Sequence, residues 1–176
     1  MKLFAIAGLL LGVAAANLAA QENSNVIVDA HGVLRWKESG TEVALFGVNY
    51  TTPFAHAFRA HRRLGVSWRE AIDADVYHFA RLGFDAYRVH VWDREISDAE
   101  GNLLVNEHVE AFDYLLAKLK ERGIKVILTP LQFGNAGYPE PGVPLAGFSS
   151  KYGKQGCLED KTSWPLQERY LAQFVS

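Results

Sequence analysis

The chain has 176 residues, of which 49% are hydrophobic, and it carries 18 basic side chains against 20 acidic ones. This is the composition of an ordinary globular protein near neutrality, without the basic excess that nucleic-acid-binding proteins usually show. Arg59, Arg62 and Arg63 do gather in one segment, but such a group is more often a solvated loop face than a phosphate clamp. We therefore expect no nucleic-acid partner.

The first 20 residues have the pattern of a secretory signal peptide. Lys2 supplies the positive charge, an apolar segment spans residues 3–16, and small residues precede a cleavage site after Ala20. The apolar segment is shorter than the roughly 20 residues that a membrane-spanning helix needs. We therefore expect cleavage near Ala20, a secreted or periplasmic protein, and no membrane span.

Cysteine and histidine give no indication of a redox or metal site. Cys157 stands alone, so no internal disulfide can form, and we interpret it as a free loop thiol whose role is open. His56, His61 and His90 follow none of the usual ligand spacings. We expect neither a metal nor a cofactor.

Residues 21–41 predict an N-terminal β-hairpin ahead of the main domain, which we expect to occupy residues 42–176. Asp29 and Gly32 are turn formers between two short β-prone segments. The main domain opens with the apolar run Val43–Val48, which is typical of a strand buried on both faces.

Two helices follow, each with a signal at both ends. Ser67, with Glu70 three residues later, predicts a helix from about Trp68 to Leu82, and Gly83 is placed to end it in the left-handed conformation. The second predicted helix begins after the capping residue Asn106 and is closed by the glycine at position 123.

A further strand is predicted at Ile124–Leu131, and Pro165 begins a third helix. The segment between them, Gln132–Ser163, is rich in glycine and proline and is expected to hold no element of its own.

The strand within residues 84–93 carries polar residues in an apolar context. Arg88, His90 and Trp92 share one face because strand side chains alternate, and the positions between them are apolar. A buried guanidinium needs a carboxylate or another acceptor. Either Arg88 pairs with a structural carboxylate, or it belongs to a polar site at the end of the strand.

Alternating strands and helices predict right-handed βαβ units and a parallel sheet. The turn after the first strand, Asn49–Pro53, lacks the glycines of a nucleotide-binding sheet. The sequence therefore favours about three βα units of a (β/α)8 TIM barrel, whose active site lies at the carboxyl ends of the strands.

Three segments, Phe46–Tyr50, Tyr87–Trp92 and Lys125–Pro130, resemble the first three strands of clan A glycoside hydrolases, most closely the cellulase-like members of glycoside hydrolase family 5. The resemblance covers about residues 26–176 and implies the N-terminal part of a TIM-barrel glycosidase. A complete barrel needs roughly 250 residues, so we expect only the first three of its eight units here.

The resemblance implies a retaining mechanism with two catalytic glutamates, one after strand four and one on strand seven. Both are expected downstream of Ser176, so this chain alone is expected to be inactive. Arg88 matches the arginine that orients the nucleophilic glutamate in the family. The pair Asn106-Glu107 is similar to the family's Asn-Glu motif, but it stands at a helix start and is interpreted as a cap.

The residues expected to contact substrate lie at the strand ends and in the loops that follow. They are Asn49, Tyr50, His90, Trp92, Asp93, Gln132, Phe133 and Tyr138. Aromatic side chains suit the apolar faces of sugar rings. The implied substrate is a plant-type polysaccharide or oligosaccharide, a β-glucan or a β-mannan.

The glycan, its linkage, endo or exo action and the oligomeric state stay open. Leu131, Gln132 and Phe133 stand where many family members have a histidine. An alternative of a different class is a non-catalytic carbohydrate-binding or degenerate barrel fragment.

Overall fold

The computed structural model describes residues 26–51, 57–132, 143 and 146–176. The expected signal peptide lies outside the described residues. Contacts divide the chain into two compact units, residues 1–44 and 45–176. Within the described residues, no helix has both the length and the apolar character needed to cross a membrane.

The first unit contains one antiparallel pair of strands, β1 (Val26–Val28) and β2 (Leu34–Trp36). Asp29 organises the turn between them. Its carboxylate accepts hydrogen bonds from two backbone N–H groups of the turn and from Nε of Arg35 at 2.5 Å. The Arg35 hydrogen bond contributes most to holding the pKa of Asp29 below its ordinary value.

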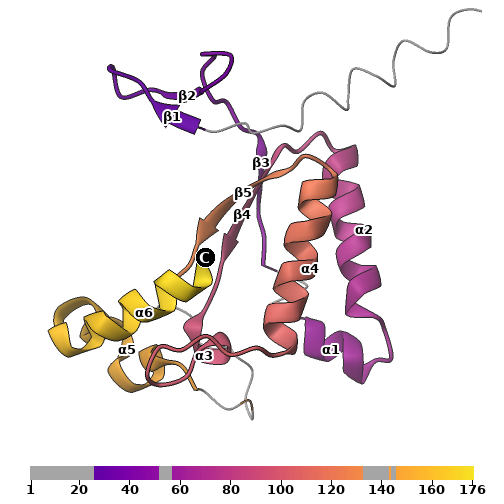
Figure 1. The fold of residues 1–176 in the computed structure, drawn as a ribbon. Coiled ribbons are helices and arrows are strands. Elements are labelled where there is room, and N and C mark those ends of the chain that lie inside the picture. The colour runs from indigo at the N-terminus through magenta and orange to yellow at the C-terminus, as the bar shows by residue number, and fades with distance from the viewer. Residues whose placement is uncertain (1–25, 52–56, 133–142, 144–145) are drawn as a thin grey trace, which may run out of the picture. The chain divides into compact units, whose positions relative to one another are not determined.

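The second unit contains a parallel sheet in the order β3-β4-β5 (Figure 1). Its strands are β3 (Gly47–Asn49), β4 (Ala86–His90) and β5 (Lys125–Thr129). In the register, Arg88 of β4 lies between Asn49 of β3 and Ile127 of β5. The prediction of an α/β fold built on a parallel sheet is confirmed.

The prediction that the first strand is buried on both faces is wrong. Among the described residues, β3 pairs with β4 alone, so it is an edge strand of only three residues. Just before it, Leu45 is 38% exposed and Phe46 is 64% exposed. An apolar run indicates burial only where a neighbouring element covers it.

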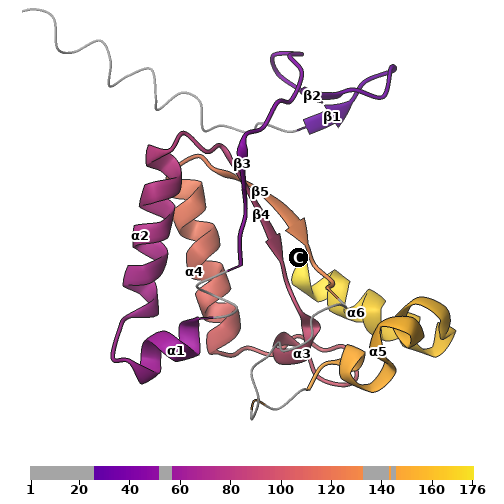
Figure 2. The same cartoon turned by 180° about the vertical axis from the view of Figure 1, so that it is seen from behind.

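One face of the sheet is covered by α2 (Trp68–Arg81) and α4 (Glu107–Glu121), which lie side by side in both views (Figures 1 and 2). Both helices and the strand β4 contribute to a single core. Its members include Ile72, Val76, Tyr87, Val89, Leu115 and Leu119. Burial of this apolar surface is the main stabilising contribution to the unit.

The ends of α2 and α4 agree with the sequence signals to within a residue. Ser67 and Asn106 each accept a hydrogen bond from the backbone N–H three residues later, at 3.3 and 3.1 Å. Gly83 and Gly123 follow the two helices with φ of 77° and 70°. Only glycine adopts this conformation at little cost, and each helix therefore ends there.

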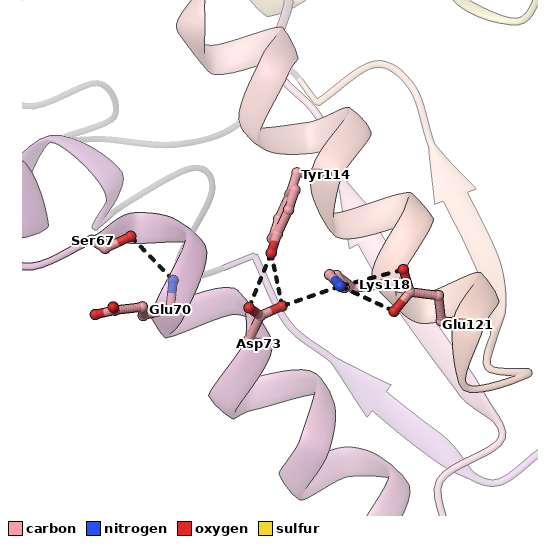
Figure 3. Close-up of polar contacts among 6 residues, drawn as sticks. All are labelled: Ser67, Glu70, Asp73, Tyr114, Lys118 and Glu121. Carbon is pink, nitrogen blue, oxygen red and sulfur yellow. Dashed lines mark hydrogen bonds and ion pairs between the residues drawn. The ribbon is translucent and has the colours of Figure 1, made fainter.

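Polar contacts join α2 to α4 along their solvent side (Figure 3). The hydroxyl of Tyr114 lies 3.0 Å from both carboxylate oxygens of Asp73. Lys118 Nζ lies 3.8 Å from Asp73 and 3.0 Å from Glu121. Desolvation, followed by the contact with Asp73, raises the pKa of Tyr114, so its hydroxyl stays protonated and donates.

The segments after the strands contain three helices that the sequence analysis did not predict. They are α1 (Phe58–Arg63), α3 (Asp93–Ile96) and α5 (Phe148–Glu159). Figure 1 shows α1 and α3 near the end of the sheet at which the strands finish. Two of these helices are shorter than two turns, too short to produce a recognisable apolar period.

The expectation that Gln132–Ser163 holds no element is wrong, because α5 and the short 3-10 helix η2 (Lys161–Ser163) lie there. Gly153, with φ of 63°, interrupts α5 and hid its periodicity in the sequence. The third predicted helix is confirmed as α6 (Trp164–Phe174), with Pro165 in its first turn. Phe174 stacks on the ring of Phe112 in α4, with 5.7 Å between centroids.

We predict that Tyr114→Phe lowers the free energy of unfolding by about 1 kcal/mol, because Asp73 loses its hydroxyl donor. Urea denaturation followed by tryptophan fluorescence measures this. The control is Tyr77→Phe in α2. Tyr77 is 48% exposed, and its hydroxyl makes no hydrogen bond with a described residue. Equal losses in the two variants would contradict the role given to the Tyr114–Asp73 contact.

Candidate functional site

The face of the sheet opposite α2 and α4 carries polar side chains. We call it the polar sheet face and define it by Asn49, Arg88, His90, Ile127 and Thr129, which the register places on one side of the three strands. Three of these residues are exposed, and His90 and Thr129 are half-buried. Solvent therefore reaches this face of the three strands.

Arg88 is exposed, and its expected burial in the strand is wrong. Its guanidinium makes no hydrogen bond or ion pair with any residue that the structure describes. The interpretation that Arg88 serves a structural carboxylate is therefore not supported. A guanidinium in contact with water needs no protein partner, so it can meet an incoming acceptor.

Two predicted substrate-binding residues meet on this side of the sheet. Nδ1 of His90 lies 3.3 Å from Oε1 of Gln132, just beyond β5. With Oε1 as the acceptor, Nδ1 donates in this contact. The contact therefore orients the His90 ring.

Tyr50 lies on the opposite side of the sheet, toward α2. Its hydroxyl donates to Asp75 at 3.2 Å, and its ring makes edge contacts with Phe79 and Tyr87 at 5.4 and 6.4 Å between centroids. Burial is the main cause that raises the pKa of Tyr50. Tyr50 supports the sheet from behind rather than forming part of the polar sheet face.

Trp92 and Asp93 are buried where β4 passes into α3. The carboxylate of Asp93 accepts hydrogen bonds from Oγ of Ser149 at 2.5 Å and from its backbone N–H at 2.8 Å. A side chain at Gly147 would place Cβ 2.3 Å from Asp93 Oδ2, so only glycine allows this approach. Asp93 thus acts as an N-terminal cap for α5, supplied by a distant segment.

Burial raises the pKa of Asp93, and the two hydrogen bonds from Ser149 oppose that rise.

Phe133 and Tyr138, the remaining predicted aromatic contacts, lie outside the described residues. Cys157 belongs to α5 rather than to a loop, and desolvation raises its pKa to about 11. Its thiol is protonated at neutral pH and is a poor nucleophile there.

A buried ionic cluster connects α1, α3 and α4, and sequence reasoning missed it. Oε1 of Glu95 accepts a hydrogen bond from Nη1 of Arg59 at 2.6 Å, and Oε2 lies 2.7 Å from Nδ1 of His108. The side chains of Glu95 and His108 are 5% and 4% exposed. Asn106 adds a hydrogen bond from Nδ2 to the backbone oxygen of Glu95 at 2.6 Å.

The interpretation of the arginine-rich segment as a solvated loop face is wrong for Arg59. It belongs to α1, and its guanidinium also lies 4.6 Å from the ring centroid of Phe58. The sequence offered one indication that Glu95 is buried, because it is adjacent to the apolar Ile96 in a short polar segment. Its partners are 36 and 13 residues away, a distance that no local pattern reveals.

The described ranges contain no group of three or more histidine, cysteine, aspartate or glutamate side chains arranged to hold a metal ion. Comparisons with protein-family models, with curated proteins and with solved structures found no match to this chain. Function is therefore argued from the chemistry of the residues.

We predict that Asp93 makes stability depend on pH. A carboxyl group whose pKa is raised by folding contributes stability that is fully present below its ordinary value of 3.8 and lost as pH rises through the raised value. The asparagine in Asp93→Asn does not titrate. As pH falls from 7 to 4, the free energy of unfolding of the wild type should therefore rise relative to that of Asp93→Asn.

Urea unfolding curves at several pH values in that range measure the difference. Asp113→Asn serves as the control because Asp113 is exposed on α4, and its curves should stay parallel to those of the wild type. Parallel profiles for Asp93→Asn as well would show that the buried carboxyl group does not titrate with folding.

Proposed function

We propose that this chain is the N-terminal part of a secreted glycoside hydrolase acting on O-glycosidic bonds of a plant-type β-glucan or β-mannan. The observation that carries the proposal is the polar sheet face at the carboxyl ends of three parallel strands. Ligands of barrel enzymes and of open α/β sheets bind at this end. The leader pattern of residues 1–20 supports secretion.

The proposed architecture is a (β/α)8 barrel in which β3, β4 and β5 are the first three strands. The polar sheet face then lines the inside of the barrel, and α2, α4 and α6 belong to its outer ring. The consecutive parallel order of the strands supports this assignment. Right-handed crossover through helices is the connection that such a barrel uses.

In this proposal Arg88 orients the nucleophilic glutamate of a retaining mechanism. Its exposed guanidinium, without a protein acceptor among the described residues, supports the assignment. Arginine can bind a carboxylate through two parallel hydrogen bonds, which fixes the carboxylate plane. The two glutamates, about 5 to 5.5 Å apart in a retaining enzyme, are expected in sequence beyond residue 176.

Sugar hydroxyl groups would bind at Asn49, His90 and Gln132, which offer both donors and acceptors. Trp92 is buried and Tyr50 is half-buried, so their proposed role is to support the wall behind the sugar rather than to stack on it. Asp93 also has a supporting role, because it holds the start of α5 through Ser149. Phe133 and Tyr138 remain proposed stacking residues.

The coding DNA downstream of the Ser176 codon tests the enzyme assignment. An open frame encoding an Asn-Glu motif after a fourth strand, and a glutamate on a later strand, is the expected result. A stop codon followed by unrelated sequence would contradict it. The non-catalytic carbohydrate-binding or degenerate barrel fragment would then be the better account.

We predict weak binding of cellohexaose or mannohexaose to the 176-residue chain, with a Kd on the order of 1 mM because few hydrogen bonds are available. Titration followed by amide NMR shifts measures it. Arg88→Gln should weaken binding about threefold or more, whereas Arg81→Gln, on the exposed end of α2, should leave it unchanged. Absence of binding by both oligosaccharides would contradict a carbohydrate site on this face.

A further inference from the structure

A cleft of about 340 Å³ lies among α1, α3 and the start of α4, and it shares no residue with the polar sheet face. Its volume falls in the range of small-molecule sites. Because α1 follows β3 and α3 follows β4, the cleft belongs to segments that leave the carboxyl ends of the strands. Parallel α/β sheets bind their ligands on this side.

The charges that line the cleft favour an anion. Three guanidinium groups, from Arg59, Arg62 and Arg94, face two carboxylates, from Glu95 and Glu107. Counted over the side chains that line the cleft, the arginines exceed the carboxylates by one. The N-terminus of α4, a helix of 15 residues that begins at Glu107, adds its positive dipole end.

The two ion pairs of the cleft differ in how easily the carboxylate of a ligand can replace the glutamate of the pair. The Arg59–Glu95 pair is fixed, because Glu95 is 5% exposed and also contacts His108. The side chains of the Arg62–Glu107 pair are 62% and 31% exposed. Pairs in contact with water contribute little to stability, so a carboxylate from solution can replace Glu107 beside Arg62.

The remaining wall of the cleft is apolar and suits a ring. Phe58, Leu104, Val143 and Ala146 contribute to it. A ligand that fits both parts of the cleft therefore has an oxyanion on one side and a flat, largely apolar face on the other. A sugar acid combines a carboxylate with the apolar face of a pyranose ring.

We propose that this cleft binds the carboxylate of an acidic sugar, with Arg62 exchanging Glu107 for the ligand. The choice of a sugar rests on the proposed function, in which the acid is a substituent or neighbouring unit of the glycan. The oxyanion chemistry rests on the arginines and on the N-terminus of α4, not on the proposed function. Free phosphate shares that chemistry, so the test includes it.

The experiment titrates the 176-residue chain with D-glucuronate, D-glucose and inorganic phosphate and follows amide NMR shifts. Glucuronate should bind saturably and shift residues of α1 and α4, and neutral glucose should not. Arg62→Gln should weaken glucuronate binding at least fivefold, by removing the exchangeable guanidinium. Glu107→Gln should strengthen it, by removing the competing carboxylate.

Opposite effects of these two variants distinguish a ligand site from a structural ion pair, whose loss would act in the same direction in both. Arg122→Gln, at the far end of α4, is the matched control and should not change the affinity. Thermal melting of each variant checks that it folds.

Unchanged glucuronate affinity in Arg62→Gln, or no glucuronate binding at all, would overturn the proposal. Phosphate binding without glucuronate binding would overturn the assignment to an acidic sugar. The proposed glycosidase function is tested separately by neutral oligosaccharides and Arg88→Gln. Failure of one site therefore does not imply failure of the other.

Discussion

The alternation of side chains between the two faces of β4 is the constraint on which the second unit depends. Tyr87 and Val89 are fully buried beneath α2 and α4, and this burial fixes which side of the strand faces the helices. Because side chains alternate, it also fixes the opposite side for Arg88 and His90. A register shift of one residue would bury the guanidinium and expose the core. Packing energy on one face thus determines the position of the polar chemistry on the other.

The segments after the strands are held by buried polar contacts in addition to apolar side chains that join the core, such as Phe58, Ile96 and Phe148. Asp93 caps α5 through Ser149, and Glu95 joins α1 and α4 through Arg59 and His108. Removing one partner of such a contact leaves a buried charge without compensation, which is strongly unfavourable. These contacts therefore specify one arrangement of short helices at the end of the sheet.

The parts of the fold that the sequence predicts well depend on local chemistry. Ser67 and Asn106 bond to N–H groups three residues away, and Gly83 and Gly123 set their own backbone conformation, so each signal lies within a short window. The roles of Asp93 and Glu95 depend on partners as far as 56 and 36 residues away. A sequence window shows such residues only as polar, and it does not distinguish a buried anchor from a solvated loop. The burial of Arg88 was misjudged because it depends on what covers the strand.

The two surfaces at the carboxyl end of the sheet differ in the kind of recognition that they offer. In the proposed function, Asn49, His90 and Gln132 present donors and acceptors that suit hydroxyl groups, beside the single guanidinium of Arg88. The cleft beside α4 presents charge, which attracts an anion from a distance and weakens as salt increases. The polar sheet face and the cleft share no residue, so substitutions in one leave the side chains of the other in place.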